Sequence, residues 1–269
     1  RYDDPRGSEE PGTRGEMAFV KLRYKLPDGT TSRLIERPVA ASLMRTAARP
    51  EIGAARVRPP GTLLYLSCPL PHDHQSAADE AWDLDFMHRQ AHEVLPALLQ
   101  SLDVKDKPWL FGHSDGGSIA LLHAAKFSAQ IEGAIVLAPH ILVEDLSVES
   151  IAKARTAYQT TDLKQRLAKY HDDPDSAFWG WNDIWLHPPF KQWSIAREIE
   201  AITRPLLAVQ GIDDEYGTLE QIRGIARRVP HTELLELPDC GHSPHKDQTA
   251  RVIAAATAFI QRHSNGDKT

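Results

Sequence analysis

The stretch that decides the fold is a serine flanked by glycines, Gly112-His113-Ser114-Asp115-Gly116-Gly117. It fits the pattern G-x-S-x-G, which puts a serine on a sharp turn between a strand and a helix. The apolar run 108–111 before it predicts a buried strand, and the run 118–125 after it predicts a helix. Glycines two residues to either side leave room for the backbone to cross tightly. The pattern predicts that Ser114 is a nucleophile and not part of an ordinary glycine-rich turn.

An acidic residue follows a later strand. Residues 205–210 form a short apolar run bounded by proline and glycine, which predicts a buried parallel strand. Asp213 and Asp214 come next, and a carboxylate in such a loop can orient an imidazole and stabilise its cation. We favour Asp214, which lies three residues past Gly211. The other aspartate would be a solvated carboxylate or a cap for the following helix.

A histidine follows the last expected strand. Residues 232–237 predict that strand, and His242 lies in the loop before a final helix that we expect over 248–261. From there its imidazole can take the proton of Ser114 and pass it to a leaving group. His245 is the rival base, but we expect it at the start of the helix, facing away.

These motifs resemble those of the α/β-hydrolases, the superfamily of esterases, lactonases and carbon–carbon-bond hydrolases. The matching segments are Gly112–Gly117, Gly211–Asp214 and Gly241–His242, and the resemblance extends from about Asp83 to His263. It implies an α/β fold, a mostly parallel sheet with helices on both faces and a helical lid.

The resemblance also implies roles for single residues. Ser114 corresponds to the nucleophile, Asp214 to the acid and His242 to the base. The backbone N–H of Asp115 corresponds to one oxyanion donor, because the family uses the residue after the nucleophile. No cofactor is implied.

The region before a helix expected over 83–102 departs from the family. An α/β-hydrolase places two parallel strands there and takes its second oxyanion N–H from the loop after the first of them, usually at a His-Gly pair. We find one such strand, at 62–66, and no His-Gly pair before the elbow. The loop that follows contains Cys68, whose N–H is the candidate substitute. We therefore expect a fold short of one N-terminal core strand.

The first 60 or so residues do not match the family. Residues 1–16 are charged and rich in proline and glycine, so we expect a disordered leader. The first methionine is Met17, which indicates a cloning or reading artefact. Residues 17–60 predict a hairpin around a Pro-Asp-Gly turn and then a linker. Truncation, fusion or a frameshift would each explain this mismatch.

The rest of the chain divides into a core and an insertion. We assign 61–139 and 203–265 to the α/β core. Residues 140–202 turn helical and aromatic, at the place where the family carries its lid. We interpret this insertion as an apolar roof over the nucleophile, with most of its rings packing the lid onto the core.

Three side chains are the candidates for contact with substrate. Trp181 and Trp185 lie in the insertion, and His113 directly precedes the nucleophile. Large aromatic rings of this kind line apolar pockets. We therefore expect the substrate to carry an apolar portion.

Length, charge and cysteine content limit the classes of function. The 269 residues suffice for one large α/β domain with a small insertion. A net charge of -6 and scattered basic residues give no nucleic-acid signature, and no apolar run is long enough to span a bilayer. No signal peptide is visible. Cys68 and Cys240 make no disulfide framework and are interpreted as free thiols, and Cys240 lacks an elbow of its own. We expect a cytoplasmic protein with a small-molecule substrate and neither a nucleic-acid nor a membrane partner.

One segment raises the question of a metal. His72-Asp73-His74 puts two imidazoles one residue apart, and these could share a divalent ion. No third ligand is identifiable nearby. We therefore interpret the segment as a polar surface loop and predict no metal site.

The combined prediction is a serine hydrolase that cleaves a carboxylic ester, thioester or lactone through an acyl-enzyme on Ser114. Cleavage of a peptide bond or of a carbon–carbon bond is an alternative reaction, because the same three residues can catalyse it. The alternative is a hydrolase-like scaffold that binds a ligand without catalysis, which the missing oxyanion loop motivates. The joint presence of Ser114, Asp214 and His242 opposes it. A third hypothesis is a defective chimera that folds poorly.

Overall fold

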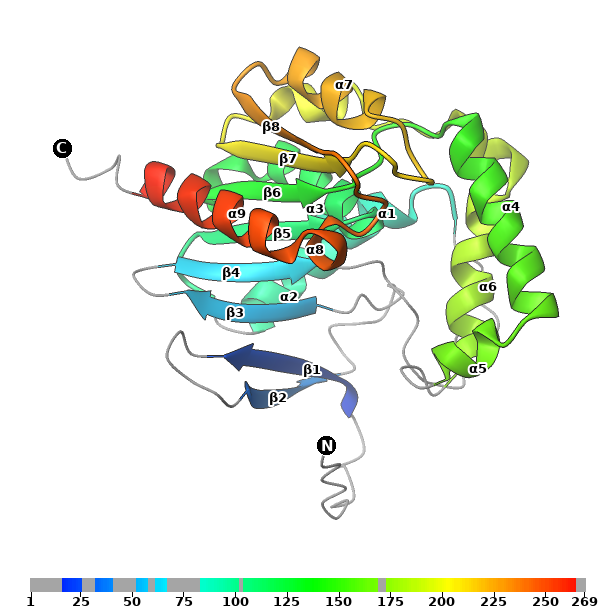
Figure 1. Ribbon diagram of the computed structural model, residues 1–269. Coiled ribbons are helices and arrows are strands. Elements are labelled where there is room, and N and C mark those ends of the chain that lie inside the picture. The colour runs from blue at the N-terminus through cyan, green and yellow to red at the C-terminus, as the bar shows by residue number, and fades with distance from the viewer. Residues whose placement is uncertain are drawn as a thin grey trace.

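The structure is a computed structural model. It describes residues 16–25, 32–40, 52–57, 61–66, 83–101, 104–168 and 173–264. Figure 1 shows a sheet with helices on both of its faces and a separate group of helices beside it. This arrangement is the α/β fold, with a helical insertion, that the sequence predicts.

Six strands form the main sheet within the described ranges, and they stand side by side in chain order. The strands are β3 (Ile52–Val57), β4 (Gly61–Leu66), β5 (Pro108–His113), β6 (Gly133–Leu137), β7 (Leu206–Gly211) and β8 (Thr232–Leu237). Strands β4 to β8 are parallel, whereas β3 runs antiparallel to β4. Because the carboxyl ends of parallel strands meet at one edge, loops far apart in sequence converge there.

The chain before β5 both confirms and corrects the sequence analysis. The expected hairpin is confirmed as β1 (Glu16–Lys25) paired antiparallel with β2 (Ser32–Ala40). Strand β3 lies where we expected a linker, so that expectation was wrong for 52–57. Its glycine and alanines have low strand propensity, and its pairing with β4 determines its conformation instead. Within the described residues, β4 is the one parallel strand before β5, as the sequence predicts.

Alternating side chains of the central strands build a hydrophobic core on each face of the sheet. In β6, Ala134 and Val136 join one core, while Ile135 and Leu137 join the other. Successive residues of a strand point to opposite faces, so a strand covered on both sides is apolar throughout. This explains why the runs around β5, β6 and β7 are continuously hydrophobic.

Helices cover the two faces unequally. One face carries α1 (Phe86–Arg89), η2 (Gln90–Val94), α2 (Leu95–Ser101) and α3 (Asp115–Lys126), and the other carries α8 (Pro244–Asp247) and α9 (Thr249–Ser264) (Figure 1). The chain also forms η3 (Ser128–Gln130) and α7 (Glu220–Arg228). Phe259 of α9 packs edge-on against Trp109 of β5, with ring centroids 5.6 Å apart. The final helix expected over 248–261 is thus confirmed, with a short helix before it.

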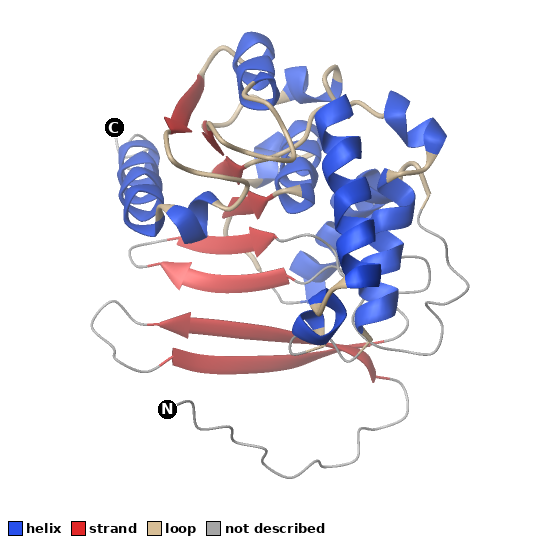
Figure 2. Cartoon of the chain, turned by 45° about the vertical axis from the view of Figure 1, so that its right-hand side comes forward, coloured by secondary structure: helices blue, strands red, loops and turns tan. Residues whose placement is uncertain are grey.

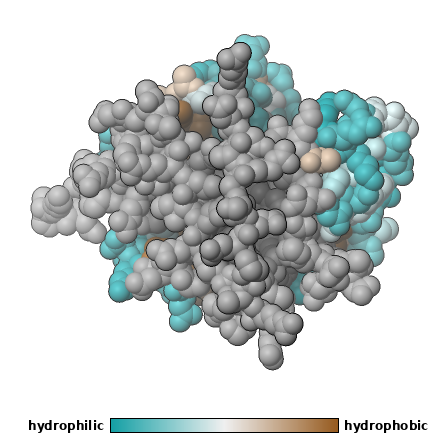
Figure 3. All heavy atoms as spheres, turned by 90° about the horizontal axis from the view of Figure 1, so that it is seen from below, coloured by the Kyte–Doolittle hydropathy of each residue, from teal (hydrophilic) through white to brown (hydrophobic). Residues whose placement is uncertain are grey.

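The segment between β6 and β7, here called the insert (residues 140–202), is mostly helical. It contains α4 (Asp145–Thr160), α5 (Leu163–Leu167), α6 (Pro174–Trp185), η4 (Pro188–Gln192) and η5 (Glu198–Ala201). Helices α4 and α6 lie side by side (Figure 2), where Tyr158 stacks on Phe178 at 3.9 Å between ring centroids. The outer surface on the side of these helices is mostly hydrophilic (Figure 3).

Polar contacts join the two longest helices of the insert. Arg155 of α4 bonds Asn182 and Asp183 of α6, which ties the two helices together by polar contacts at their junction. Within the described parts of the chain, no helix combines the length and the apolar character needed to cross a bilayer.

Candidate active site

Ser114 stands on a sharp turn where β5 passes into α3. Its backbone has φ 55° and ψ −128°, a left-handed conformation that non-glycine residues seldom adopt. The surrounding backbone holds it there, because the Ser114 N–H donates to Leu137 O (3.0 Å) and the N–H of Gly117 donates to Ser114 O (2.8 Å). This sharp turn places the partly exposed side chain at the carboxyl edge of the sheet.

Two glycines permit the close approach of chain segments around this turn. A Cβ on Gly112 would lie 2.3 Å from Gly116 O, so the strand and the helix touch through their backbones. A Cβ on Gly211 would lie 2.0 Å from Cys240 O, which brings the loop after β7 against the loop after β8. Any larger residue at either position would push these segments apart.

The loops after β7 and β8 bring an aspartate and a histidine to Ser114. His242 Nε2 lies 2.9 Å from Ser114 Oγ, and His242 Nδ1 lies 2.9 Å from Asp214 Oδ1. An Nδ1–H that donates to the carboxylate leaves Nε2 as the acceptor for the serine hydroxyl. The structure therefore aligns Ser114, His242 and Asp214 in one chain of hydrogen bonds.

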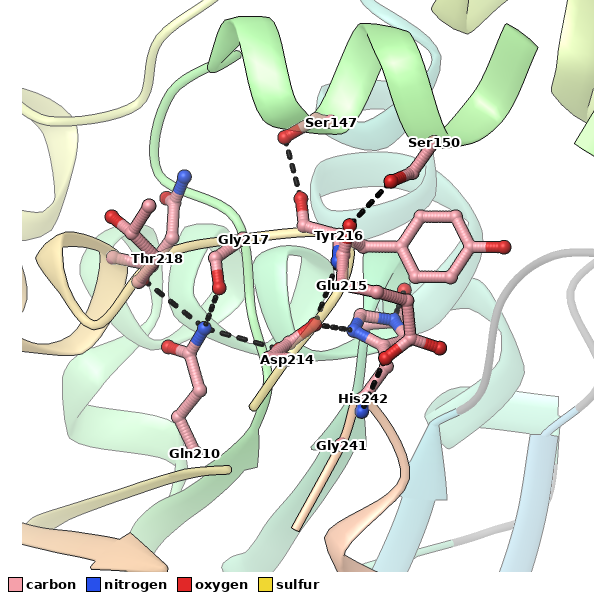
Figure 4. Close-up of polar contacts among 12 residues, drawn as sticks. Ser147, Ser150, Gln210, Asp214, Glu215, Tyr216, Gly217, Thr218, Gly241 and His242 are labelled. Atoms are coloured by element: carbon pink, nitrogen blue, oxygen red, sulfur yellow. Dashed lines mark hydrogen bonds and ion pairs between the residues drawn. The ribbon is translucent and has the colours of Figure 1, made fainter. Parts of the chain in front are cut away.

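Asp214 is buried and hydrogen-bonded at both oxygens (Figure 4). Oδ1 also accepts the N–H of Tyr216 at 2.9 Å, and Oδ2 accepts the side-chain amide of Gln210 at 3.1 Å. Burial opposes ionisation of this carboxyl, but the hydrogen bond and charge of His242, with the Tyr216 N–H, hold its pKa below the ordinary value. Asp214 is thus kept as the anion that an imidazolium needs beside it.

Gln210 is a contributor that the sequence analysis missed. Its side chain is fully buried at the end of β7, and its amide also donates to Gly217 O at 2.8 Å. The signal was present, since a single glutamine ends an otherwise apolar strand. A buried amide in that position needs partners, and the loop that carries Asp214 supplies them.

The rival residues lie elsewhere. Asp213 is exposed, and its backbone N–H donates to Cys240 O at 3.0 Å. His245 lies in α8, with its ring centroid 4.6 Å from that of His113. The structure brings Asp214 and His242 to Ser114, and within the described residues it records no bond from either rival to that serine.

His113, predicted to contact substrate, bonds the backbone of the loop that carries His242. Its Nε2 donates to the carbonyl oxygen of His242 at 2.7 Å. Burial, reinforced by the neighbouring His242, lowers the pKa of His113 to about 3, so the ring is neutral. Sequence spacing held no signal for this contact, because it joins the ends of β5 and β8.

The two tryptophans predicted to contact substrate differ in burial. Trp185 is 2 % exposed, its Nε1–H donates to Asp115 Oδ2 at 3.3 Å, and its ring meets that of His140 edge-on. A ring so enclosed offers almost no surface to a ligand, so the geometry favours a packing role. Trp181 is only partly buried against the same core and retains accessible surface.

The remaining candidates concern the oxyanion donors and a metal. Asp115 begins α3, and the start of a helix is where backbone N–H groups meet anions. Cys68 and the segment His72–His74 lie outside the described residues. In the part of the chain that is described, no group of three His, Cys, Asp or Glu side chains could hold a metal ion.

A nucleophile elbow on a mostly parallel sheet defines the class of an α/β-hydrolase fold. Residues 31–256 match the sequence model of the alpha/beta hydrolase family, and the chain belongs to that family. The match begins at residue 31 and so includes the later part of the stretch 17–60, which the sequence analysis left outside the family.

Solved structures show the same fold at low identity. An esterase from Thermogutta terrifontis superposes with a TM-score of 0.57 and 16% identity, over 92% of this chain and 99% of that one. A serine hydrolase involved in carbazole degradation has a TM-score of 0.56 and 18% identity, over 74% of this chain and 79% of that one. The enol-lactonase of Burkholderia xenovorans LB400 has a TM-score of 0.51 and 19% identity, over 65% and 73%.

Two curated relatives match over part of their length. An L-allo-isoleucyltransferase of Pseudomonas savastanoi pv. glycinea is 35% identical over 69 residues, 26% of this chain and 24% of that protein. The acetyltransferase component of the acetoin cleaving system of Pseudomonas putida is 24% identical over 210 residues, 71% of this chain and 54% of that protein. The chain thus spans about half or less of each relative.

Proposed function

We propose that this member of the family is a serine hydrolase that cleaves a carboxylic ester, thioester or lactone with an apolar portion. The observation that carries the proposal is the chain of hydrogen bonds from Ser114 through His242 to Asp214, at 2.9 Å for each link. The strained backbone of Ser114 supports it, since such strain is stored where it serves a function.

The proposed reaction has two halves. Ser114 Oγ attacks the substrate carbonyl carbon while His242 Nε2 takes the hydroxyl proton, and the carbonyl electrons move to the oxygen. His242 then gives the proton to the leaving alcohol or thiol as the carbon–leaving-group bond breaks, which leaves an acyl-enzyme. Water attacks the acyl group, with His242 again as base, and Ser114 recovers its proton. Asp214 stabilises the imidazolium in each half.

Stabilisation of the oxyanion completes the proposal. The backbone N–H of Asp115, at the start of α3, is the first proposed donor, and the N–H of Cys68 is the second. One such donor contributes about 10²–10³ in rate. The proposed roof is the insert, where Trp181 keeps accessible surface for substrate.

The proposal also covers the cellular compartment of the enzyme and the size of its substrate. Cys240 is a free, buried thiol, and burial raises its pKa to about 11, which makes it a poor nucleophile. A small-molecule substrate in the cytoplasm fits this thiol and the net charge of -6.

A panel of nitrophenyl esters tests the substrate class. With an apolar roof over Ser114, we expect kcat/KM to rise about tenfold from the acetate to the butyrate ester, because added methylenes bury apolar surface. Trp181→Ala should reduce this preference, whereas Trp185→Phe should leave it unchanged. Equal rates for all chain lengths would contradict an apolar acyl site, and no turnover of any ester, thioester or lactone by folded protein would contradict the activity.

A further inference from the structure

The loop that carries His242, here called the base loop (residues 238–243), has no regular structure of its own. Asp239 in it has φ 52°, a left-handed conformation, and the loop joins β8 to α8. A catalytic imidazole on such a loop is placed only as well as its backbone is held. The contacts that hold this backbone come from other parts of the chain.

Both backbone polar groups of His242 are bonded by side chains. The carboxylate of Glu215 accepts the His242 N–H at 3.1 Å, and His113 Nε2 donates to the His242 carbonyl at 2.7 Å. Glu215 lies directly beside the base loop in Figure 4. The next N–H of the loop, that of Gly241, donates to Asp247 at 3.0 Å. Hydrogen bonds from side chains therefore hold the backbone around His242, where no helix or strand does so.

The carboxylate of Glu215 packs closely against the base loop. A Cβ on Gly241 would lie 3.1 Å from Glu215 Oε2, which is a tight contact. Glu215 is also the residue after Asp214, which bonds the His242 ring at 2.9 Å. One short segment therefore holds the imidazole with one carboxylate and the backbone of the same residue with the next.

Helix α4 of the insert holds that segment in turn. Ser150 Oγ donates to Glu215 O at 2.5 Å, and Ser147 Oγ donates to Tyr216 O at 2.6 Å (Figure 4). Residues three apart share a helix face, so both hydroxyls reach successive carbonyls of one loop. The insert is therefore connected to His242 through Glu215.

We propose that Glu215 is a positioning residue for His242, which holds the backbone of the base in place through the His242 N–H. This inference rests on the proposed function, since it assigns His242 the role of base. Glu215 itself touches no reacting atom.

Other ionisable groups also lie near His242. They come from β5, the loop after β6, the loop after β7 and the α8 region, and they are His113, His140, Asp214, Tyr216, His245 and Asp247. Burial lowers the pKa of His113 and of His140 to about 3, so both stay neutral in the working range. Asp214 and Glu215 are the acidic side chains bonded to His242.

The test is the rate at which a fluorophosphonate inactivates the protein. Glu215→Gln keeps a hydrogen-bond acceptor for the His242 N–H, so its rate should stay within about threefold of the wild type. Glu215→Ala removes the acceptor, and its rate should fall about tenfold. Asp213 is an exposed carboxylate of the same loop, as Glu215 is, so Asp213→Asn is the matched control and should react like the wild type.

A second readout does not depend on reactivity. Amide hydrogen exchange of the His242 N–H should be at least about tenfold faster in Glu215→Ala than in the wild type, and close to wild type in Glu215→Gln. Unchanged exchange and an unchanged inactivation rate in Glu215→Ala, or a loss in Asp213→Asn as large as in Glu215→Ala, would overturn the role of Glu215. If the wild type does not react at all, the proposed function fails, and the exchange rate alone still decides the role of Glu215.

Discussion

Replacing His242 by alanine is expected to lower kcat/KM for an activated ester by about 10⁴–10⁶-fold. The imidazole is the group that the structure places 2.9 Å from the Ser114 hydroxyl, and without it the serine keeps its proton. Stability should change little, because the His242 side chain is partly exposed. Steady-state kinetics beside a thermal melt of each protein measures both quantities.

His245→Ala is the matched control for that substitution. It removes an imidazole from the same region, but one that lies in α8 against His113. Its kcat/KM should stay within about threefold of the wild type. A variant of His242 that keeps most of its activity, together with a large loss in the variant of His245, would show that the base has been assigned to the wrong residue.

Lowering the pH from 7 to 5 is expected to reduce the free energy of unfolding by about 5 kcal/mol. Burial lowers the pKa of His123 to about 4 and the pKa values of His113 and His140 to about 3. In the unfolded chain all three titrate near 6.5. As the pH falls below 6.5, the unfolded state binds protons that the folded state does not bind. Each such site lowers the free energy of unfolding by up to about 1.4 kcal/mol per pH unit.

Urea unfolding at pH 7, 6 and 5 measures this loss. His123→Gln removes one of the three sites and keeps a donor for Ala91 O, which the ring bonds at 2.9 Å. The loss of stability in this variant should be about two thirds of that of the wild type. A stability that stays constant from pH 7 to pH 5 would show that these histidines accept protons in the folded state.

The sequence predicted the parts of the molecule that depend on local pattern. The run around Ser114, with its strand, its turn and its helix, is specified by consecutive residues, and the order of Asp214 and His242 along the chain follows from the resemblance. The structure then brings these residues together. The spacing also indicated the helical insert, because its pattern changes between two buried strands.

The parts that escaped prediction depend on contacts between distant segments. Strand β3 exists through its pairing with β4, and its own residues are poor strand formers. The bonds from His113 and Glu215 to the His242 backbone join residues 129 and 27 positions apart, so no spacing rule reveals them. Trp185 shows a related limit, since an aromatic residue on an amphipathic helix has the same pattern in a core as in a binding site.

The most direct test of the account is covalent labelling of Ser114. Wild-type protein and Ser114→Ala are treated with a fluorophosphonate at neutral pH, and intact masses are measured with a melt of each protein. The account predicts one adduct, located on Ser114, in the wild type and none in the variant. A cooperatively folded wild type without an adduct, or an equal adduct in both proteins, would contradict the proposal that Ser114 is an activated nucleophile.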